Sequence, residues 1–272
     1  MKYSTVELTV DSSIAAVRLN RPDRANALNR ALWDELRLAF KAVDAMADAR
    51  VVVLTGAGAH FSGGIDLDML AEMQGTVHRA SADRGRAVEA LRRHILDLQD
   101  VFNCVEQCRV PVIAAISGAC IGAGVDLATA CDLRYSTRDA RFCVKEIDMA
   151  IVADIGAVQR LPHIIGGGRA RELIYTGRTI TGAEAEAIGL VNRTFETADA
   201  LQAEVNAVAR ELASKSPLTL RGCKQTILYS RDHTVAEGLQ HVALWNAGAV
   251  MSEDLLEAIR AQQEKRKPKY RD

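Results

Sequence analysis

The chain twice places a glycine-rich turn directly after a run of strand-like apolar residues. The run VVVLTG (51–56) leads to SGGIDL (62–67), and the run VIAAISG (112–118) leads to GAGVDL (122–127). In both places a buried strand, a turn and the start of a helix follow one another. Repeated units of this kind build α/β folds. The repetition therefore predicts the α/β class.

The segments around these units read as strands and helices. Alternating apolar and polar residues predict a hairpin of two strands over 4–10 and 14–19, and an apolar stripe predicts a helix over 29–47. A short helix should open near Asp66, and a long polar helix is expected over 82–107. The first half of the chain is thus a mixture of both element types.

The end of the chain has a different character from the rest. From Pro217 onward the pattern is purely helical, over 217–230, 233–249 and 252–265. We therefore predict two regions: a β-rich core over residues 1–200 and a helical region over residues 201–272.

Composition excludes several classes of function. The chain has 272 residues, of which 49% are apolar, which is ample for a packed interior. Its formal net charge is −1, so no global charge attracts nucleic acid or an anionic membrane. No apolar run is long enough to span a bilayer. We expect neither a nucleic acid nor a membrane as a partner.

Cysteine, histidine and the termini give further expectations. The six cysteines form no CxxC pair, and the six histidines show no metal-ligand spacing, so we predict no metal. The N-terminal sequence enters a strand pattern directly, and the C-terminal PKYRD is not a peroxisomal tripeptide. From these features we expect a cytoplasmic protein.

The two glycine-rich turns have a possible chemical use. Glycine lets a bound group approach the backbone closely, and N–H groups at a helix N-terminus point toward negative charge. Two similar turns could therefore converge on one oxyanion. The alternative is that the glycines only permit tight turns. Neither turn completes a nucleotide-phosphate motif such as GxGxxG.

Three carboxylates stand in unusually apolar surroundings. Asp126 lies in an apolar helix start, Glu146 ends the strand-like RFCVKE, and Asp154 lies within MAIVADIGAVQRL. Each has an alternative structural role: Asp126 could cap its helix, Glu146 could face solvent, and Asp154 could cap a helix that begins at Ile155. Three acids in such surroundings are harder to explain by separate structural roles than one would be.

Four segments make the chain similar to a known family. They are NRPDRANAL (20–28), LTGAGAHFSGGIDL (54–67), PVIAAISGACIGAGVDLATACDLRYST (111–137) and KEIDMAIVADIGAVQRLP (145–162). With these segments the chain resembles the crotonase family, also called the enoyl-CoA hydratase/isomerase superfamily, over essentially its whole length. The resemblance implies a spiral of ββα units, a C-terminal helical trimerisation region, and a homotrimer or a hexamer built from two trimers.

The resemblance also assigns binding roles. The family's two oxyanion-hole amides would fall on Gly63 and Ala123, where they would hold the thioester oxygen of an acyl-CoA as enolate charge develops. No separate cofactor is implied, because coenzyme A is part of the substrate. The residues implied to contact CoA are Arg24, Ala25, Ala27, Asp66 and Tyr270. The alternatives are that the side chains of the loop before the first helix only pack there, and that the C-terminal tail is a solvated basic segment. The stretch 69–100 would shape the acyl pocket.

The acids distinguish the branches of the family. The set Asp126, Glu146 and Asp154 resembles that of the dienoyl-CoA isomerases, which convert 3,5-dienoyl-CoA to 2,4-dienoyl-CoA in unsaturated fatty-acid β-oxidation. Glu146 would remove a proton at C2 and Asp154 would protonate C6. A proton donor must be protonated at the start, and burial or a neighbouring carboxylate would raise its pKa. Asp126 would tune or position Glu146, so the three groups should titrate as a coupled set.

Two other functions stay open at this point. Hydration of 2-enoyl-CoA, or isomerisation of 3-enoyl-CoA to 2-enoyl-CoA, would use Glu146 but would leave Asp154 without a purpose. Some proteins of this fold are described as RNA-binding. The short basic tail (264–272) and the lack of an aromatic and basic stripe argue against that function.

Overall fold

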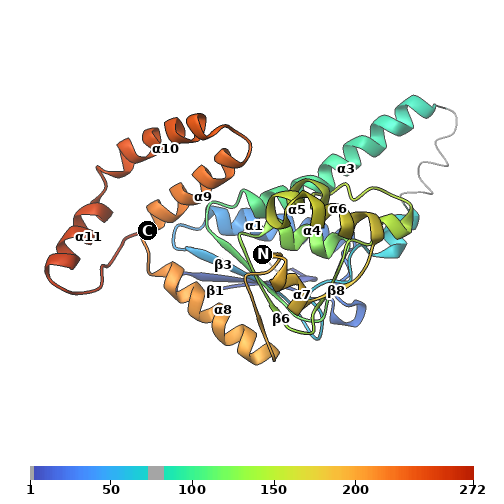
Figure 1. Cartoon of the computed structure of the whole chain (residues 1–272), viewed down its shortest axis with the longest axis horizontal. Coiled ribbons are helices and arrows are strands. Elements are labelled where there is room, and N and C mark those ends of the chain that lie inside the picture. Colours follow the sequence, from blue (N-terminus) through green and yellow to red (C-terminus); the bar gives the residue numbers. More distant parts are fainter. Residues whose placement is uncertain (1–2, 73–82) are drawn as a thin grey trace.

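The main sheet has six strands in the order β1-β2-β3-β4-β6-β9 (Figure 1). A computed structural model describes residues 3–72 and 83–272. β1 (Val6–Asp11) and β2 (Ile14–Leu19) form the predicted antiparallel hairpin. The other strands pair parallel to their neighbours, and they are β3 (Val51–Gly56), β4 (Val112–Ile116), β6 (Leu133–Thr137) and β9 (Arg193–Phe195).

A smaller sheet continues from the second glycine-rich unit. It contains β5 (Ala119–Ile121), β7 (Arg141–Cys143) and β8 (Ile180–Thr181), with β5 parallel to β7 and β7 antiparallel to β8. An isolated bridge joins Ser62 to Cys120. This bridge brings the first glycine-rich turn alongside the start of the second.

The central strands are buried on both faces. All five residues of β4 are buried, which explains its continuous apolar run. Most helices of the core cover one face of the sheet, whereas α8 (Ala198–Ala213) covers the other with Leu201, Val205 and Ala209. The predicted boundary at residue 200 assigned α8 to the helical region. In the structure α8 packs as part of the core, and the separate helical region begins only at Pro217.

The α/β class is confirmed, and the core helices are α1 (Arg30–Ala45), α3 (Arg84–Glu106), α4 (Ala123–Ala130), α5 (Ala157–Ile165), α6 (Gly167–Thr176) and α7 (Gly182–Ala187). Among them, α1 and α3 closely match the helices predicted over 29–47 and 82–107. Short 3-10 turns are η1 (Pro22–Arg24) and η2 (Glu146–Met149), and the chain is also helical over 67–72. Within the predicted acyl-pocket stretch 69–100, residues 73–82 lie outside the described residues, as does residue 82 of the long helix predicted over 82–107.

Three helices follow the core and extend away from it. They are α9 (Pro217–Arg231), α10 (Val235–Ala249) and α11 (Glu253–Gln263), close to their predicted ranges (Figure 1). Each begins at a residue whose side-chain oxygen accepts an amide N–H of the first turn, namely Ser216, Thr234 and Ser252. Capping residues therefore fix where these helices begin.

A buried ion pair attaches the helical region to the core. Lys224 of α9 donates to Asp132 at 2.7 Å and to the Val110 carbonyl at 3.1 Å. Beyond this anchor the helices expose large apolar side chains, among them Leu244 of α10 and Met251 after it. Within the part of the chain that the structure describes, no helix combines the length and apolar character needed to cross a bilayer.

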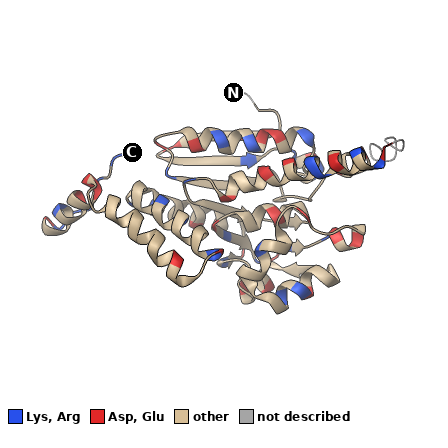
Figure 2. Ribbon diagram, turned by 90° about the horizontal axis from the view of Figure 1, so that it is seen from above, with Lys and Arg blue, Asp and Glu red and all other residues tan. Residues whose placement is uncertain are grey.

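Charged residues of both signs are interspersed along the helices (Figure 2). No segregation by sign is visible among the described residues in this view, in agreement with the formal net charge of −1. A nucleic-acid surface requires clustered Lys and Arg on one face. The charge distribution therefore gives no support to RNA binding.

Candidate active site

A cavity of about 670 Å³ lies between α1, α3, η2 and the segment that follows the first glycine-rich turn. Its wall is largely apolar and includes Trp33 of α1 and Leu91 and Leu98 of α3. Among the described lining residues, Glu146 and Asp154 carry carboxylates. An apolar cavity with a few convergent polar groups is typical of a site for a small molecule.

The first glycine-rich turn presents the amide of Ile65, not that of Gly63, to this cavity. The Gly63 N–H donates to the Ala25 carbonyl at 2.7 Å and is therefore occupied. The Ile65 N–H has no hydrogen-bond partner among the described residues, and Ile65 lines the cavity. Gly64, at φ +96°, turns the chain between the two amides. The structure thus contradicts the oxyanion role predicted for Gly63 and offers Ile65 instead.

The second glycine-rich turn supplies another amide to the same cavity. Ala123 is the first residue of α4 and lines the cavity, and its N–H also lacks a partner among the described residues. A Cβ on Gly64 would lie 3.7 Å from the Ala123 nitrogen and 2.7 Å from the Ile121 carbonyl oxygen. The two turns are therefore in contact, and only glycine fits at position 64. Two amides at one cavity are suited to stabilise an oxyanion.

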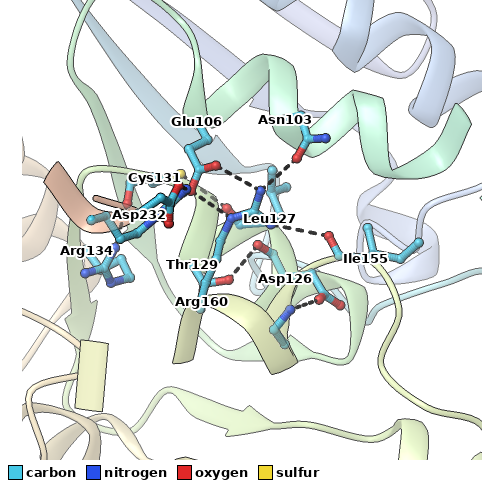
Figure 3. Close-up of polar contacts among 12 residues, drawn as sticks. Asn103, Glu106, Asp126, Leu127, Thr129, Cys131, Arg134, Ile155, Arg160 and Asp232 are labelled. Carbon is cyan, nitrogen blue, oxygen red and sulfur yellow. Dashed lines mark hydrogen bonds and ion pairs between the residues drawn. The ribbon is translucent and has the colours of Figure 1, made fainter. Parts of the chain in front are cut away.

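Asp126 is buried behind the cavity wall. Its side chain is in the first turn of α4, the residue is 1% exposed, and a carboxylate oxygen accepts the N–H of Ala157 (Figure 3). Burial and, second to it, the charge of Glu146 raise the pKa of Asp126 to about 8, against the opposing effect of the Ala157 amide. Asp126 is therefore largely protonated at neutral pH.

Glu146 and Asp154 are the carboxyl groups that face the cavity. Burial, followed by the charge of Asp154, raises the pKa of Glu146 above its ordinary value. Burial also raises the pKa of Asp154. One carboxylate oxygen of Glu146, Oε2, is buried and has no hydrogen-bond partner among the described residues. Such an oxygen is available to take a proton from a bound substrate.

None of the three acids has the structural role that the sequence left open as the alternative to catalysis. Asp126 is inside α4, and Gly122 is the N-cap of that helix. Asp154 is not a cap, because α5 begins at Ala157 after Gly156. Glu146 opens η2, is only partly exposed, and reaches the second turn: a Cβ on Gly122 would lie 2.9 Å from Glu146 Oε1.

The loop predicted to contact CoA lies beside the first glycine-rich turn. Arg24 is exposed at the end of η1. The Ala25 carbonyl accepts the Gly63 N–H, and the Ala27 carbonyl accepts Arg21 Nη1 at 2.5 Å. Each carbonyl therefore already has one partner and keeps a second lone pair for a ligand.

The other two predicted CoA residues have different surroundings. Asp66 is buried and pairs with Arg21 at 2.9 Å, and the hydrogen bond from Arg21 holds the pKa of Asp66 below its usual value. This ion pair ties the loop to the turn. Tyr270 lies against the C-terminal helices, where its carbonyl accepts Arg50 Nη2 at 2.8 Å, and it does not line the cavity that contains Glu146.

Two residues beside the carboxylates were not predicted from the sequence. Ile65 contributes through its backbone, which leaves no side-chain signal. Arg160 is a buried cation in α5, 8% exposed, and it donates to the carbonyl of Ile155, next to Asp154 (Figure 3). The one sequence signal for Arg160 is a charged residue among the apolar residues of AVQRLP.

The arrangement is able to move protons next to a stabilised oxyanion. Ile65 and Ala123, whose amides have no partner among the described residues, line the same cavity as two carboxyl groups of raised pKa. Because the charge of one carboxylate disfavours ionisation of the other, one ionised and one protonated group coexist more readily than two ionised ones. This combination supplies a base and an acid at once.

Comparison with known proteins gives consistent relatives. The sequence model of the family described as Enoyl-CoA hydratase/isomerase matches residues 9–272. A protein of Arabidopsis thaliana named Delta(3,5)-Delta(2,4)-dienoyl-CoA isomerase, peroxisomal, is 46% identical over 271 residues, covering 98% of this chain and 97% of that protein. The mouse protein with the same enzyme name, mitochondrial, is 42% identical over 270 residues, covering 98% of this chain and 82% of that protein.

These names overturn the expected location. The sequence features predicted a cytoplasmic protein, whereas the relatives are named as peroxisomal in Arabidopsis thaliana and as mitochondrial in mouse and human. The prediction was wrong because it rested on missing targeting signals. Such signals are addresses read by receptors and are not required by the fold.

Solved structures agree with the predicted crotonase fold. An enoyl-CoA hydratase from Bacillus anthracis superposes with a TM-score of 0.89 at 34% identity, covering 98% of this chain and 99% of that one. Pseudomonas aeruginosa DspI gives a TM-score of 0.89 at 26% identity, covering 100% of this chain and 98% of that one. With the family match over residues 9–272, the chain belongs to the enoyl-CoA hydratase/isomerase family.

Proposed function

We propose that the protein is an isomerase that converts 3,5-dienoyl-CoA to 2,4-dienoyl-CoA, in the β-oxidation of unsaturated fatty acids. The observation that carries the proposal is the position of Asp154, which shares an apolar cavity with Glu146. Similarity over 98% of the chain to proteins named as dienoyl-CoA isomerases supports the same reaction.

The reaction uses the two cavity carboxyl groups at opposite ends of the diene. The ionised Glu146 takes a proton from C2, and the electrons move into a dienolate. The protonated Asp154 then gives its proton to C6, so the double bonds shift from C3 and C5 to C2 and C4. Glu146 ends protonated and Asp154 ionised, and exchange of protons with solvent restores the starting state.

The amides of Ile65 and Ala123 stabilise the intermediate. Both N–H groups are free of partners among the described residues, and both residues line the cavity. The thioester oxygen gains negative charge only as the proton leaves C2. Donors that are fixed in advance therefore stabilise the transition state more than the bound substrate.

Asp126 influences the reaction from a buried position outside the cavity. Buried and held by the Ala157 amide, it interacts electrostatically with Glu146 and disfavours full ionisation of the group. No hydrogen bond joins Asp126 to Glu146 among the described residues, so its influence is through charge and through the segment that carries Ala157. An Asp126→Asn variant with the activity of the parent would exclude this role.

Hydration of a 2-enoyl-CoA is the alternative, since the similar Bacillus anthracis structure is titled as an enoyl-CoA hydratase. A hydratase of this family needs two carboxylates on one water, at the positions of Asp126 and Glu146. Here Asp126 does not line the cavity, and the acid that accompanies Glu146 there is Asp154. The isomerase reaction uses both Glu146 and Asp154, the first as the base and the second as the acid.

Binding of CoA and assembly complete the proposal. The loop with Arg24, Ala25 and Ala27 lies next to the oxyanion turn and is placed to hold CoA, with Asp66 fixing the loop through Arg21. The apolar side chains exposed on α10 and after it, such as Leu244 and Met251, support a homotrimer or a dimer of trimers. Tyr270 would reach CoA only in a neighbouring subunit.

A paired assay tests the function. Purified enzyme is given a 3,5-dienoyl-CoA and, separately, a 2-enoyl-CoA, while ultraviolet absorbance follows the conjugated 2,4-dienoyl thioester formed and the 2-enoyl thioester consumed. The proposal expects rapid formation of the dienoyl product with little hydration. Hydration alone, unaffected by Asp154→Asn, would identify a hydratase and reject the proposal.

A further inference from the structure

Arg160 joins three segments of the chain beside the catalytic acids. Its Nε donates to Glu106 at 2.9 Å and its Nη2 donates to Asn103 at 2.9 Å, both on α3 (Figure 3). Its Nη1 donates to the Ile155 carbonyl at 3.3 Å. The side chain is only 9% exposed. Through Arg160, α3 therefore holds the backbone directly after Asp154.

The segment held by Arg160 serves two of the acids at once. Asp154 stands at its start and lines the cavity, and the N–H of Ala157 at its end donates to Asp126. Between them, Gly156 has φ +140°, and a Cβ there would lie 1.8 Å from Arg160 Nη1. A side chain at position 156 would therefore strain the backbone and displace the Arg160 guanidinium.

The charge of Arg160 also acts on Asp126. Burial dominates and raises the pKa of Asp126, while the Arg160 guanidinium lowers it. Other charged or titratable groups face the same region from α3, α5 and α9. They line a second cavity of about 340 Å³ that Asp154 and Arg160 share with Glu106, His163, Arg231 and Asp232.

We propose that Arg160 is a positioning residue for the reaction: it fixes residues 154–157 so that Asp154 faces the bound diene and Ala157 keeps its bond to Asp126. The proposal rests on the proposed function for its reaction but on hydrogen bonds within this chain for its geometry. Glu106 orients Arg160 and is in turn held by Arg231 of α9 at 2.6 Å.

A purely structural role is the competing explanation, because losing one partner of a buried ion pair destabilises a fold wherever the pair lies. Arg37 provides a matched control. It is a partly buried arginine that pairs with Asp97 of α3 at 2.8 Å, and no contact of its side chain with residues 154–157 is present in the described chain. Arg37→Gln removes a similar ion pair from the same helix.

The first experiment compares kinetics of Arg160→Gln, Arg160→Lys and Arg37→Gln, per folded active site, with the 3,5-dienoyl-CoA. A displacement of a catalytic group by about 1 Å costs on the order of 100-fold in rate. We expect Arg160→Gln to lower kcat by about 100-fold with KM within about threefold, Arg160→Lys to recover part of the loss, and Arg37→Gln to keep the parent kcat. Equal kcat in all variants, with similar losses of thermal stability, would overturn the proposal.

The second experiment needs no substrate. Carbon-13 NMR follows the titration of the aspartate carboxyl groups in the free enzyme. Removing a positive charge favours the protonated acid, so Arg160→Gln should raise the pKa of Asp126, while Arg37→Gln should leave it unchanged. An unchanged titration in Arg160→Gln would contradict the proposal. If the parent does not isomerise the diene but the titration shifts, the proposed function fails, whereas the interaction of Arg160 with Asp126 stands.

Discussion

At the scale of single residues, Asp126, Glu146 and Asp154 differ in their surroundings. Glu146 and Asp154 face an apolar cavity, whereas Asp126 is sealed behind its wall and bonded to a backbone amide. The same residue type therefore has different tasks at positions 126 and 154. Burial raises the pKa of all three groups above their ordinary values.

Replacing Asp154 should remove the acid and leave binding intact. Asparagine has the shape of aspartic acid but cannot deliver a proton, so Asp154→Asn should lower kcat by about 10²-fold to 10⁴-fold. Steady-state kinetics with the 3,5-dienoyl-CoA measures this loss. Asp148→Asn is the control, because Asp148 is exposed and pairs with Lys145 at 2.5 Å. Equal losses in the two variants would contradict a specific role for Asp154.

The raised pKa of Asp126 should appear in the stability of the protein. The folded state holds the Asp126 proton up to a pKa of about 8, whereas the unfolded chain releases it near its ordinary value of 3.8. The contribution of this group to the free energy of unfolding is therefore full below pH 4 and is lost as the pH rises to 8, by at most ~1.4 kcal/mol per pH unit.

Asp126→Asn cannot ionise and should lose this dependence. Urea unfolding at pH 5 and pH 8, at one protein concentration, should show the variant gaining stability relative to the parent as the pH rises. The amide oxygen can still accept the Ala157 N–H, so the helix contact is kept. A difference between variant and parent that is constant across this range would mean that Asp126 is not protonated when folded.

At this scale, the sequence could predict those site residues that act through a side chain in unusual surroundings. The apolar surroundings of Asp126, Glu146 and Asp154 marked them together. The oxyanion amide was misassigned to Gly63, because the direction of a backbone N–H depends on the φ of Gly64, which the sequence does not give. Arg160 was missed because its partners, Glu106 and Asn103, lie more than fifty positions away.

At the scale of elements, the two glycine-rich turns contact each other beside the cavity, where we propose the oxyanion site. The contact of Gly64 with the Ile121 carbonyl leaves no room for a side chain, and φ at Gly64 is +96°. Gly63 is less restricted: a Cβ there would meet the Ala25 Cβ at 3.5 Å, an ordinary contact distance. Neighbouring glycines thus have unequal importance.

A pair of alanine substitutions tests this difference. Gly64→Ala should push the first turn away from Ala123 and lower kcat by about 10²-fold to 10³-fold, the effect of losing one oxyanion donor. Gly63→Ala should keep most of the activity. Steady-state kinetics and circular dichroism of both variants provide the measurement. A larger loss in Gly63→Ala than in Gly64→Ala would return the oxyanion role to Gly63.

The positions of the helices along the chain could be predicted from the sequence, but the surfaces against which they pack could not. The apolar stripe over 29–47 and the helical pattern over 217–230 placed α1 and α9 within a few residues of their observed ends. The pattern of α8 shows an apolar face but not which surface covers that face. In the structure, Leu201 and Val205 of α8 meet Val51 and Val53 of β3, which makes α8 part of the core.

At the scale of the whole molecule, the C-terminal region carries large apolar side chains that are exposed on the single chain. Leu244 is 79% exposed and Met251 is 86% exposed. Exposed apolar patches mark interaction surfaces. With the family resemblance, they support assembly through α9 to α11.

A charge on this surface should weaken the assembly. Sedimentation velocity of the parent should give a homotrimer or a hexamer, and Leu244→Glu should shift the population toward smaller species, because an unpaired charge is costly to bury. Leu38→Glu is a matched control, since Leu38 is an exposed apolar residue on the surface of α1, outside the C-terminal helices. A monomeric parent would contradict this prediction.

In the proposed reaction two different carboxyl groups handle the two protons: Glu146 takes one from C2 and Asp154 delivers one to C6. The direct test is isomerisation of the 3,5-dienoyl-CoA in deuterium oxide, stopped after a single turnover, with the product analysed by NMR. Because Asp154 carries a proton exchanged from solvent, the account predicts deuterium at C6 of the 2,4-dienoyl-CoA. Transfer of the original C2 hydrogen to C6, with no deuterium gained, would mean that one group carries the proton across, and would contradict the account.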